Sequence, residues 1–331
     1  MSDTTVVAAP ESPAPAGRAP RQRALVKFNL LFIFVTLCAV AAFVAPKFRS
    51  SQNLANLLQQ SSVTGIVAIG MTLVILTAGI DLSVGSVAAL AGMLVAIFLG
   101  VGIPWPLAIL LAVGAGAVSG GIVGGLSAYL LLPAFMVSLA ALQSVRGLTY
   151  LTTNGVPTSS EIPQALRFLG AGSVGPVPTV GVIFILVTLA AAFVLRKTTY
   201  GEYIYAVGSN KDAARLSGLP VKRILTSVYV ISGALAAFAG VLLTARLTIG
   251  QPTANQGLEL DAIAAVVLGG TSLSGGKGGI LGTFIAVLLL SVLRNLFNLM
   301  GLSSFFQMFV TGVILIAALV LNHLLDRHSA R

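Results

Sequence analysis

Three carboxylates in this chain stand where long apolar runs are interrupted, and these side chains are the best suited to acid–base or ion-binding chemistry. The first is Asp81, which lies between two apolar runs in a turn rich in glycine and serine. A charge placed in hydrocarbon is costly, so Asp81 must face protein, water or an interface. The residues of interest in this turn are Gly79, Asp81, Leu82, Ser83, Gly85 and Ser86.

The turn has two interpretations. In one, Ser83 and Ser86 cap the helix that follows, Asp81 interacts with the positive end of its dipole, and the turn lies at the cytosolic surface. In the other, the turn is a functional break beside a pathway or a contact with a soluble partner. The residue types in this turn do not decide between them.

The other two carboxylates, Glu259 and Asp261, begin a later apolar run. Acidic residues at a helix N-terminus stabilise the helix, so a purely structural role is one interpretation. A role at an outer gate is an equally good one. Arg246 lies close by in the threading given below, and we expect it to pair with one of the two acids.

Four of the uncharged polar side chains within apolar runs are candidates to line a transport path. In membrane helices such groups mostly bond a neighbouring helix, but they are also the groups that would line a path for a hydroxyl-rich solute. The candidates are Gln143, Ser144, Asn295 and Asn298.

The sequence predicts no catalytic residue, metal site or cofactor in this chain. The only cysteine is Cys38, and His323 and His328 have only Asp326 beside them, whereas a metal site needs three or four convergent ligands. The run at 275–278 is glycine-rich and contains a lysine, but no serine or threonine follows that lysine. It is therefore not a phosphate-binding loop.

Composition indicates the class of protein to which these residues belong. Of 331 residues, 56% are apolar and only 8% are charged, against about 25% charged in soluble domains. This excludes a soluble enzyme, a nucleic-acid-binding domain and a disordered chain. The sequence predicts an all-α, polytopic inner-membrane helical bundle of about ten transmembrane helices, some of them broken or short. The expected spans are 28–45, 61–79, 82–101, 104–131, 134–153, 178–195, 224–247, 260–273, 279–298 and 303–323.

The net charge of +10 sets the expected orientation rather than indicating a nucleic-acid partner. With the N-terminus inside, most Lys and Arg residues fall on the cytosolic side, and the even number of spans puts both termini there. Three parts outside the spans are expected: a disordered cytosolic tail (1–27), an outer loop (154–177) and a cytosolic C-terminal tail (324–331). The membrane domain covers 28–323, and its fourth span carries glycines that favour close packing within one subunit.

A further loop, 196–223, is basic and is expected to face the cytosol. Within it Ser209 or Asn210 is a plausible N-cap, Asp212 falls in the first turn and Gly218 is a C-cap signal. The loop is thus predicted to hold a short capped helix, of the kind that would dock a soluble partner or else stand in solvent. Its residues are Asn210, Asp212, Ala213, Ala214, Arg215, Leu216, Ser217 and Gly218.

Three segments together resemble one known family. The first is 70–86, around Asp81; the second is 207–218, in the cytosolic loop; the third is 268–278, with Gly269-Gly270-Thr271 and Gly275-Gly276-Lys277. In this order they are similar to the signatures of sugar-type ABC importer permeases, the ribose permease family. The similarity runs over roughly residues 50–323. Branched-chain amino-acid permeases are more distant and lack the pattern around Asp81.

The resemblance implies a division of labour. Two permease subunits, expected as a homodimer, would form the pore in the bacterial inner membrane and be surrounded by lipid. A separate cytosolic subunit would bind ATP and Mg²⁺, hydrolyse the ATP and dock on the helix at 210–218. A soluble binding protein would deliver the sugar, a monosaccharide such as ribose or a related pentose or hexose.

Two other functions stay open. An ABC permease for branched-chain amino acids, nucleosides or another small solute would have the same architecture. An ion-coupled secondary transporter would need acidic residues inside the membrane, and the spans offer almost none once Asp81, Glu259 and Asp261 are placed at helix ends.

Overall fold

The computed structural model describes residues 20–159 and 161–328, and most of this length is helical. The helices that coincide with the ten apolar runs are α1 (Pro20–Val44), α2 (Ser51–Leu76), α3 (Val84–Gly100), α4 (Trp105–Tyr129), α5 (Ala134–Leu151), α7 (Thr179–Lys197), α10 (Val221–Leu247), α11 (Leu258–Leu268), α12 (Ile280–Leu299) and α13 (Ser304–His328). The shorter elements are η1 (Pro46–Arg49), α6 (Gln164–Ala171), α8 (Thr199–Ser209), α9 (Lys211–Leu216), β1 (Thr158–Ser159), β2 (Ser173–Val174), β3 (Val177–Pro178) and β4 (Ile249–Gly250).

Six of these helices are long and apolar enough to cross a membrane: α2, α4, α5, α7, α10 and α12. Shorter apolar stretches lie in α1, α3 and α13. Helix α11 has 11 residues and rises about 16 Å, against a hydrocarbon core of about 30 Å. The polytopic helical fold is therefore confirmed, whereas a count of ten membrane crossings is not.

The two interruptions predicted from glycine and serine shorten α3 and α11. Residues 77–83 join α2 to α3, and residues 269–279 join α11 to α12, both without regular helix. Such backbone is tolerated at membrane depth only where protein covers it, because its amides and carbonyls need partners. The first segment is largely buried by neighbouring helices, whereas the second is only partly covered, with Gly270, Ser274, Lys277 and Gly278 exposed.

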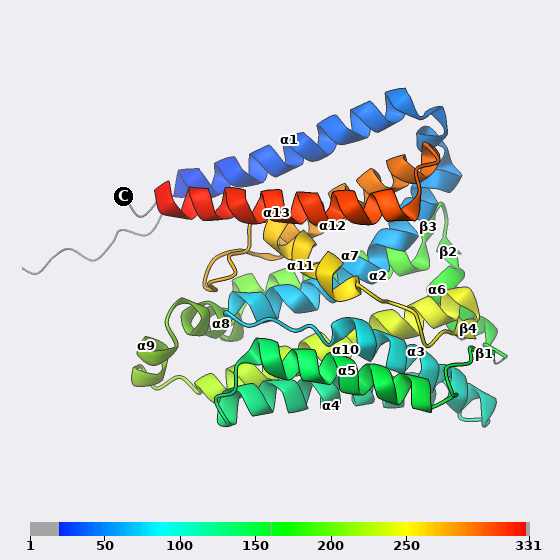
Figure 1. Cartoon of the computed structure of the whole chain (residues 1–331), viewed down its shortest axis with the longest axis horizontal. Coiled ribbons are helices and arrows are strands. Elements are labelled where there is room, and N and C mark those ends of the chain that lie inside the picture. Colours follow the sequence, from blue (N-terminus) through cyan, green and yellow to red (C-terminus); the bar gives the residue numbers. More distant parts are fainter. Residues whose placement is uncertain (1–19, 160, 329–331) are drawn as a thin grey trace, which may run out of the picture.

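The bundle has two distinct ends (Figure 1). Helices α8 and α9 lie at one end, where α1 also begins and α13 ends. Helix α6 and the small strand pairs lie at the other end, where β1 pairs with β4 and β2 pairs with β3, both antiparallel. The predicted cytosolic and outer loops are thus at opposite ends of the molecule, while their orientation in a membrane stays a prediction.

Both predicted tails differ from the structure at their inner edges. Within the described residues α1 already covers 20–27 and α13 runs on through 324–328, so these inner parts of the predicted tails are helical. The basic segment before residue 28 contains good helix formers. Residues 1–19 and 329–331 of the predicted tails lie outside the described residues.

Helix α10 is the centre of the fold, packing against α2, α3, α4 and α6. Its closest neighbour is α4, on the glycine face predicted for close packing. A Cβ on Gly120 would overlap the carbonyl oxygen of Tyr229, and one on Gly124 would stand 2.9 Å from the Cα of Thr226. Gly121 and Gly125 have far more room. The face formed by Gly120 and Gly124 therefore packs within the subunit, as expected for the glycines of the fourth span.

This contact predicts a sharp difference between two similar substitutions. Gly120→Ala should destabilise the fold by about 1–3 kcal/mol because α4 and α10 must separate to admit the methyl group. Gly125→Ala is the matched control, since a Cβ there meets nothing within 4 Å. Thermal unfolding of the purified protein in detergent measures both. Equal melting temperatures for the two variants would contradict this account of the α4–α10 contact.

Candidate functional site: the interrupted helices and the short helix beside them

Asp81 is fully buried in the segment between α2 and α3. Its Oδ1 accepts hydrogen bonds from the backbone amide of Ser83 at 3.0 Å and from the Ser83 hydroxyl at 2.6 Å. Its Oδ2 accepts from the hydroxyl of Ser232 on α10, at 3.3 Å. The carboxylate thus closes a tight local turn and ties it to the central helix.

The residue before it fixes the same segment to two helices. The carbonyl oxygen of Ile80 accepts from the Tyr229 hydroxyl of α10 and from the Ser138 hydroxyl of α5, each at 3.2 Å. Both donors are buried. Together with Asp81 they give the irregular backbone the partners that a helix would otherwise supply.

Of the two interpretations of this turn, the one that placed it at the surface is therefore wrong, and the serine caps that it included do not form. Ser83 is the N-cap of α3, but within the described chain its side chain caps no amide of α3. Its hydroxyl donates to Asp81, and the Ser86 hydroxyl donates to the Ser83 carbonyl at 2.8 Å. Leu82 is half-buried beside them. The serines serve a buried turn because helices from elsewhere in the chain cover it.

The two glycines of the turn allow close approach of other segments. A Cβ on Gly79 would stand 2.6 Å from the Tyr229 hydroxyl. A Cβ on Gly85 would overlap the carboxylate of Glu259 and stand 2.7 Å from the carbonyl oxygen of Asn255. The start of α3 is thus packed directly against the start of α11.

Segments from all three predicted signatures meet at one point beside α8, which we call the glycine junction (Leu76, Gly208 and Gly275–Gly276). The amide of Gly276 donates to the Leu76 carbonyl at the end of α2, at 2.9 Å. A Cβ on Gly208 would overlap that carbonyl oxygen and stand 2.7 Å from the Gly276 amide. The Tyr205 hydroxyl of α8 also donates to the Gly278 carbonyl, at 3.1 Å. Helix α8 is therefore in backbone contact with both interrupted regions.

Helix α9 follows α8 directly and is capped at both ends, as predicted. The Asn210 side chain accepts from the amides of Asp212 and Ala213 at 3.0 and 2.9 Å. At the other end Gly218 has φ +81°, and its amide donates to the Arg215 carbonyl at 3.0 Å. An ion pair joins Asp212 to Arg215 at 3.4 Å, but both side chains are largely exposed, so it adds little stability.

Ala213 and Ala214 lie on different faces of α9. Ala214 is buried against its own chain, whereas Ala213 is exposed and the Leu216 side chain is 85% exposed. Ser217 and Gly218 are exposed as well. Ala214 therefore anchors α9 to the bundle, and the free face of α9 presents a leucine flanked by charged and polar residues.

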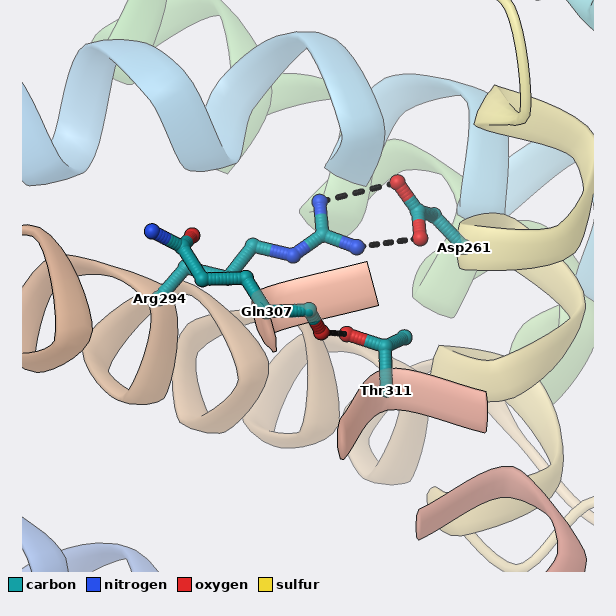
Figure 2. Close-up of polar contacts among 4 residues, drawn as sticks. All are labelled: Asp261, Arg294, Gln307 and Thr311. Atoms are coloured by element: carbon teal, nitrogen blue, oxygen red, sulfur yellow. Dashed lines mark hydrogen bonds and ion pairs between the residues drawn. The ribbon is translucent and has the colours of Figure 1, made fainter. Parts of the chain in front are cut away.

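The two acids at the start of α11 have separate surroundings. Asp261 forms a two-bonded ion pair with Arg294 of α12, one of whose bonds measures 2.8 Å (Figure 2). Figure 2 also shows Gln307 and Thr311 of α13, where the Thr311 hydroxyl donates to the Gln307 carbonyl oxygen at 2.8 Å. Arg246 was expected to pair with Glu259 or Asp261, and it does not pair with Asp261, because α12 packs against α11 and brings Arg294 to it.

Glu259 has no ion-pair partner among the described residues, and its Oε2 atom is buried without a hydrogen bond there. The cation that acts on it electrostatically is Arg146 of α5, not Arg246. The Arg146 Nη1 atom instead donates to the carbonyl oxygens of Pro252 and Ala254, at 3.1 and 2.8 Å.

The four candidate pathway residues do not come together. Gln143 and Ser144 are exposed on α5. Asn295 is buried on α12 and exchanges two hydrogen bonds with Asn53 of α2, at 2.8 and 3.0 Å. Asn298 accepts from Gln307 at 2.8 Å. The two asparagines join helices, whereas the α5 pair remains available.

Comparison with known proteins gives a consistent result over most of the chain. A family model described as the permease component of branched-chain amino acid transport systems matches residues 53–319. The ribose import permease protein RbsC of Escherichia coli K12 is 44% identical over 302 residues, which cover 90% of this chain and 94% of RbsC. The chain belongs to the ribose permease family.

Other members of this ABC permease family agree. RbsC of Bacillus subtilis is 43% identical over 293 residues, covering 88% of this chain and 90% of that protein. The xylose transport system permease protein XylH of E. coli K12 is 33% identical over 367 residues, which cover 90% of this chain and 93% of XylH. No solved structure matches the chain. The resemblance carried by the three signature segments is thus confirmed.

Several residues that shape this permease site were missed from the sequence. Tyr229, Ser138 and Ser232 hold the Asp81 turn, and Gly208 allows α8 to touch α2. Single hydroxyls and glycines in apolar helices carry no periodic signal that would have found them. Arg146 offered one signal, since a cation inside an apolar run is unusual and points to a buried partner.

The role of Asp81 predicts different outcomes for two substitutions. Asp81→Ala leaves the Ser83 amide and the Ser83 and Ser232 hydroxyls without their acceptor, which should lower stability by about 2–4 kcal/mol. Asp81→Asn keeps an acceptor oxygen and should retain most of the stability. Thermal unfolding in detergent compares them, with Asp212→Ala on exposed α9 as the neutral control. Wild-type stability in Asp81→Ala would show that the carboxylate does not hold the turn.

Proposed function

We propose that this chain is the membrane-spanning subunit of an ATP-driven importer that carries a monosaccharide, ribose or a related pentose or hexose, into the cytosol. The observation that carries this proposal is the near-full-length similarity to ribose import permeases. The xylose permease is less similar over a comparable share of the chain, which favours ribose-like substrates. The exposed, capped α9 is the feature that fits coupling to a separate ATPase.

The pathway in this proposal runs along α5. In the single subunit only 17% of α5 is buried, yet the open face of this helix carries Gln143 and Ser144. Polar side chains are costly against lipid, so this face needs a protein or water neighbour. A second copy of the chain, in a homodimer, supplies that neighbour and leaves the polar groups facing a shared path. Their amide and hydroxyl groups suit a neutral, hydroxyl-rich solute.

Coupling in this proposal depends on α9 and the glycine junction. A cytosolic subunit that binds ATP and Mg²⁺ would receive the free face of α9, with Leu216 at its centre. Because α9 follows α8 directly, movement of α9 would reach α2 and the segment before α12 through Gly208. Both interrupted regions would then shift together, which is what a change of access requires.

The remaining partners follow from the two ends of the molecule. The chain is proposed to lie in a bacterial inner membrane with both termini cytosolic, at the α9 end. A soluble sugar-binding protein would then dock at the opposite end, over α6 and the strand pairs. Specificity would be shared with that protein, so the permease itself needs only weak sugar contacts.

The decisive test is reconstitution. The permease is placed in proteoliposomes with the ATPase and the soluble binding protein from the same organism, and uptake of labelled ribose, xylose, galactose, leucine and adenosine is measured. Uptake of a sugar that requires all three components and ATP is the expected result. Uptake of leucine or adenosine alone would favour another ABC substrate. Uptake without the ATPase, driven by an ion gradient, would indicate a secondary transporter.

Coupling has its own prediction. Leu216→Glu would place a charge in the ATPase contact, so co-purification of the ATPase and sugar uptake should both fall at least tenfold. Val174→Glu is the matched control for co-purification of the ATPase, because Val174 is also exposed but lies at the opposite end, where the sugar-binding protein is proposed to dock. Ala214→Glu is unsuitable, since Ala214 is buried and its replacement would damage the permease itself. If Leu216→Glu leaves the assembly intact, α9 is not the docking helix.

A further inference from the structure

The segment between α10 and α11, residues 248–257, covers a small cavity at the strand-bearing end of the molecule. The walls of the cavity come from α3 and α10, and its remaining lining comes from this segment itself. The lining includes Ala88, Ala89 and Gly92 of α3, Gly240 and Thr244 of α10, and Gln251 and Asn255 of the segment. Removal of the segment would open the space between the two helices to the outer end.

Few contacts hold this segment against α5. The Arg146 guanidinium donates to two of its carbonyl oxygens, those of Pro252 and Ala254. One helical turn further along α5, the Tyr150 hydroxyl accepts from the Gln256 side chain at 3.2 Å. Arg146 is thus bound to neutral carbonyl groups, although the carboxylate of Glu259 is close enough to act on it electrostatically.

The ends of the segment have the backbone of a hinge. Thr248 has φ +59°, and Gly257 has φ +78°. A left-handed conformation is strained for a β-branched residue such as Thr248, at a cost of about 1 kcal/mol or more. Hinges absorb large changes in φ and ψ at a few such positions at the ends of elements. The segment can therefore swing about its two ends without unwinding α10 or α11.

We propose that residues 248–257 form the outer gate of the permease and that Arg146 is the positioning residue that holds the gate shut. This inference rests on the proposed function, because it assumes a transport path beside α5. Opening breaks the two bonds from Arg146, the Tyr150–Gln256 bond and the pairing of β4 with β1, and it exposes the cavity between α3 and α10. The freed guanidinium then faces the path, where sugar hydroxyl oxygens can accept the same two hydrogen bonds.

The gate is tested by the accessibility of the cavity. The reporter is Ala89→Cys in a Cys38→Ala background, because Ala89 is 1% exposed and lines the cavity. Its reaction with a membrane-impermeant maleimide is timed in the purified permease, with no sugar or ATPase present. Arg146→Gln should speed the reaction about tenfold or more, since two charge-assisted bonds are lost, and Arg146→Lys should give an intermediate rate.

Two further variants keep the test decisive. Arg167→Gln is the control, because Arg167 is exposed at the same end and should leave the rate unchanged. Tyr150→Phe removes only the contact with Gln256 and should give a smaller increase, which still reports on the gate if Arg146→Gln does not fold. Equal rates in wild type, Arg146→Gln, Tyr150→Phe and Arg167→Gln would overturn the proposal.

The assembled transporter separates this inference from the proposed function. In wild type, addition of the sugar-loaded binding protein and ATP should accelerate labelling at Ala89→Cys. Sugar uptake with no change in labelling would overturn the gate while leaving the proposed function intact. A complete absence of uptake would contradict the proposed function. The labelling rates of the Arg146 variants in the isolated permease would still decide whether Arg146 holds the segment shut.

Discussion

The structure depends on one backbone contact, in which the end of α2, the end of α8 and the segment before α12 meet. The Leu76 carbonyl accepts the Gly276 amide there, and Gly208 has no side chain that would separate them. Three segments far apart in the sequence are thereby locked into one rigid connection. A rigid connection transmits displacement instead of absorbing it, because packed interiors deform little.

The interrupted helices satisfy the requirement that the membrane imposes on irregular backbone. Ile80 and Asp81 receive hydroxyl donors from α5 and α10, so the segment is stable without being helical. Asp81 is thus a buried carboxylate held by hydroxyls and an amide. Asp261 at the start of α11 is the contrasting case in the same chain, a partly exposed carboxylate paired with Arg294. The two acids therefore differ in the kind of partner that fixes them.

Sequence reasoning was most successful where the determinants are local. Hydropathy predicted the helices, and the caps at Asn210 and Gly218 were predicted because their partners lie within a few residues. It failed where partners come from distant elements. The burial of Asp81 follows from Ser138, 57 positions away, and Ser232, 151 positions away, and neither distance leaves a mark on local pattern. Unless it is known which helices pack together, the sequence of a buried turn cannot be distinguished from that of a surface turn.

The glycine contact between α4 and α10 also has a consequence for biosynthesis. Gly120 and its neighbour at Tyr229 are 109 positions apart in the chain. At translation rates of about 5–20 residues per second, α4 enters the membrane several seconds before α10 exists. During that interval the glycine face of α4 has no partner and is open to lipid or to another nascent chain. The assembly of this subunit thus includes an interval in which a helix that packs by close backbone contact is without its partner.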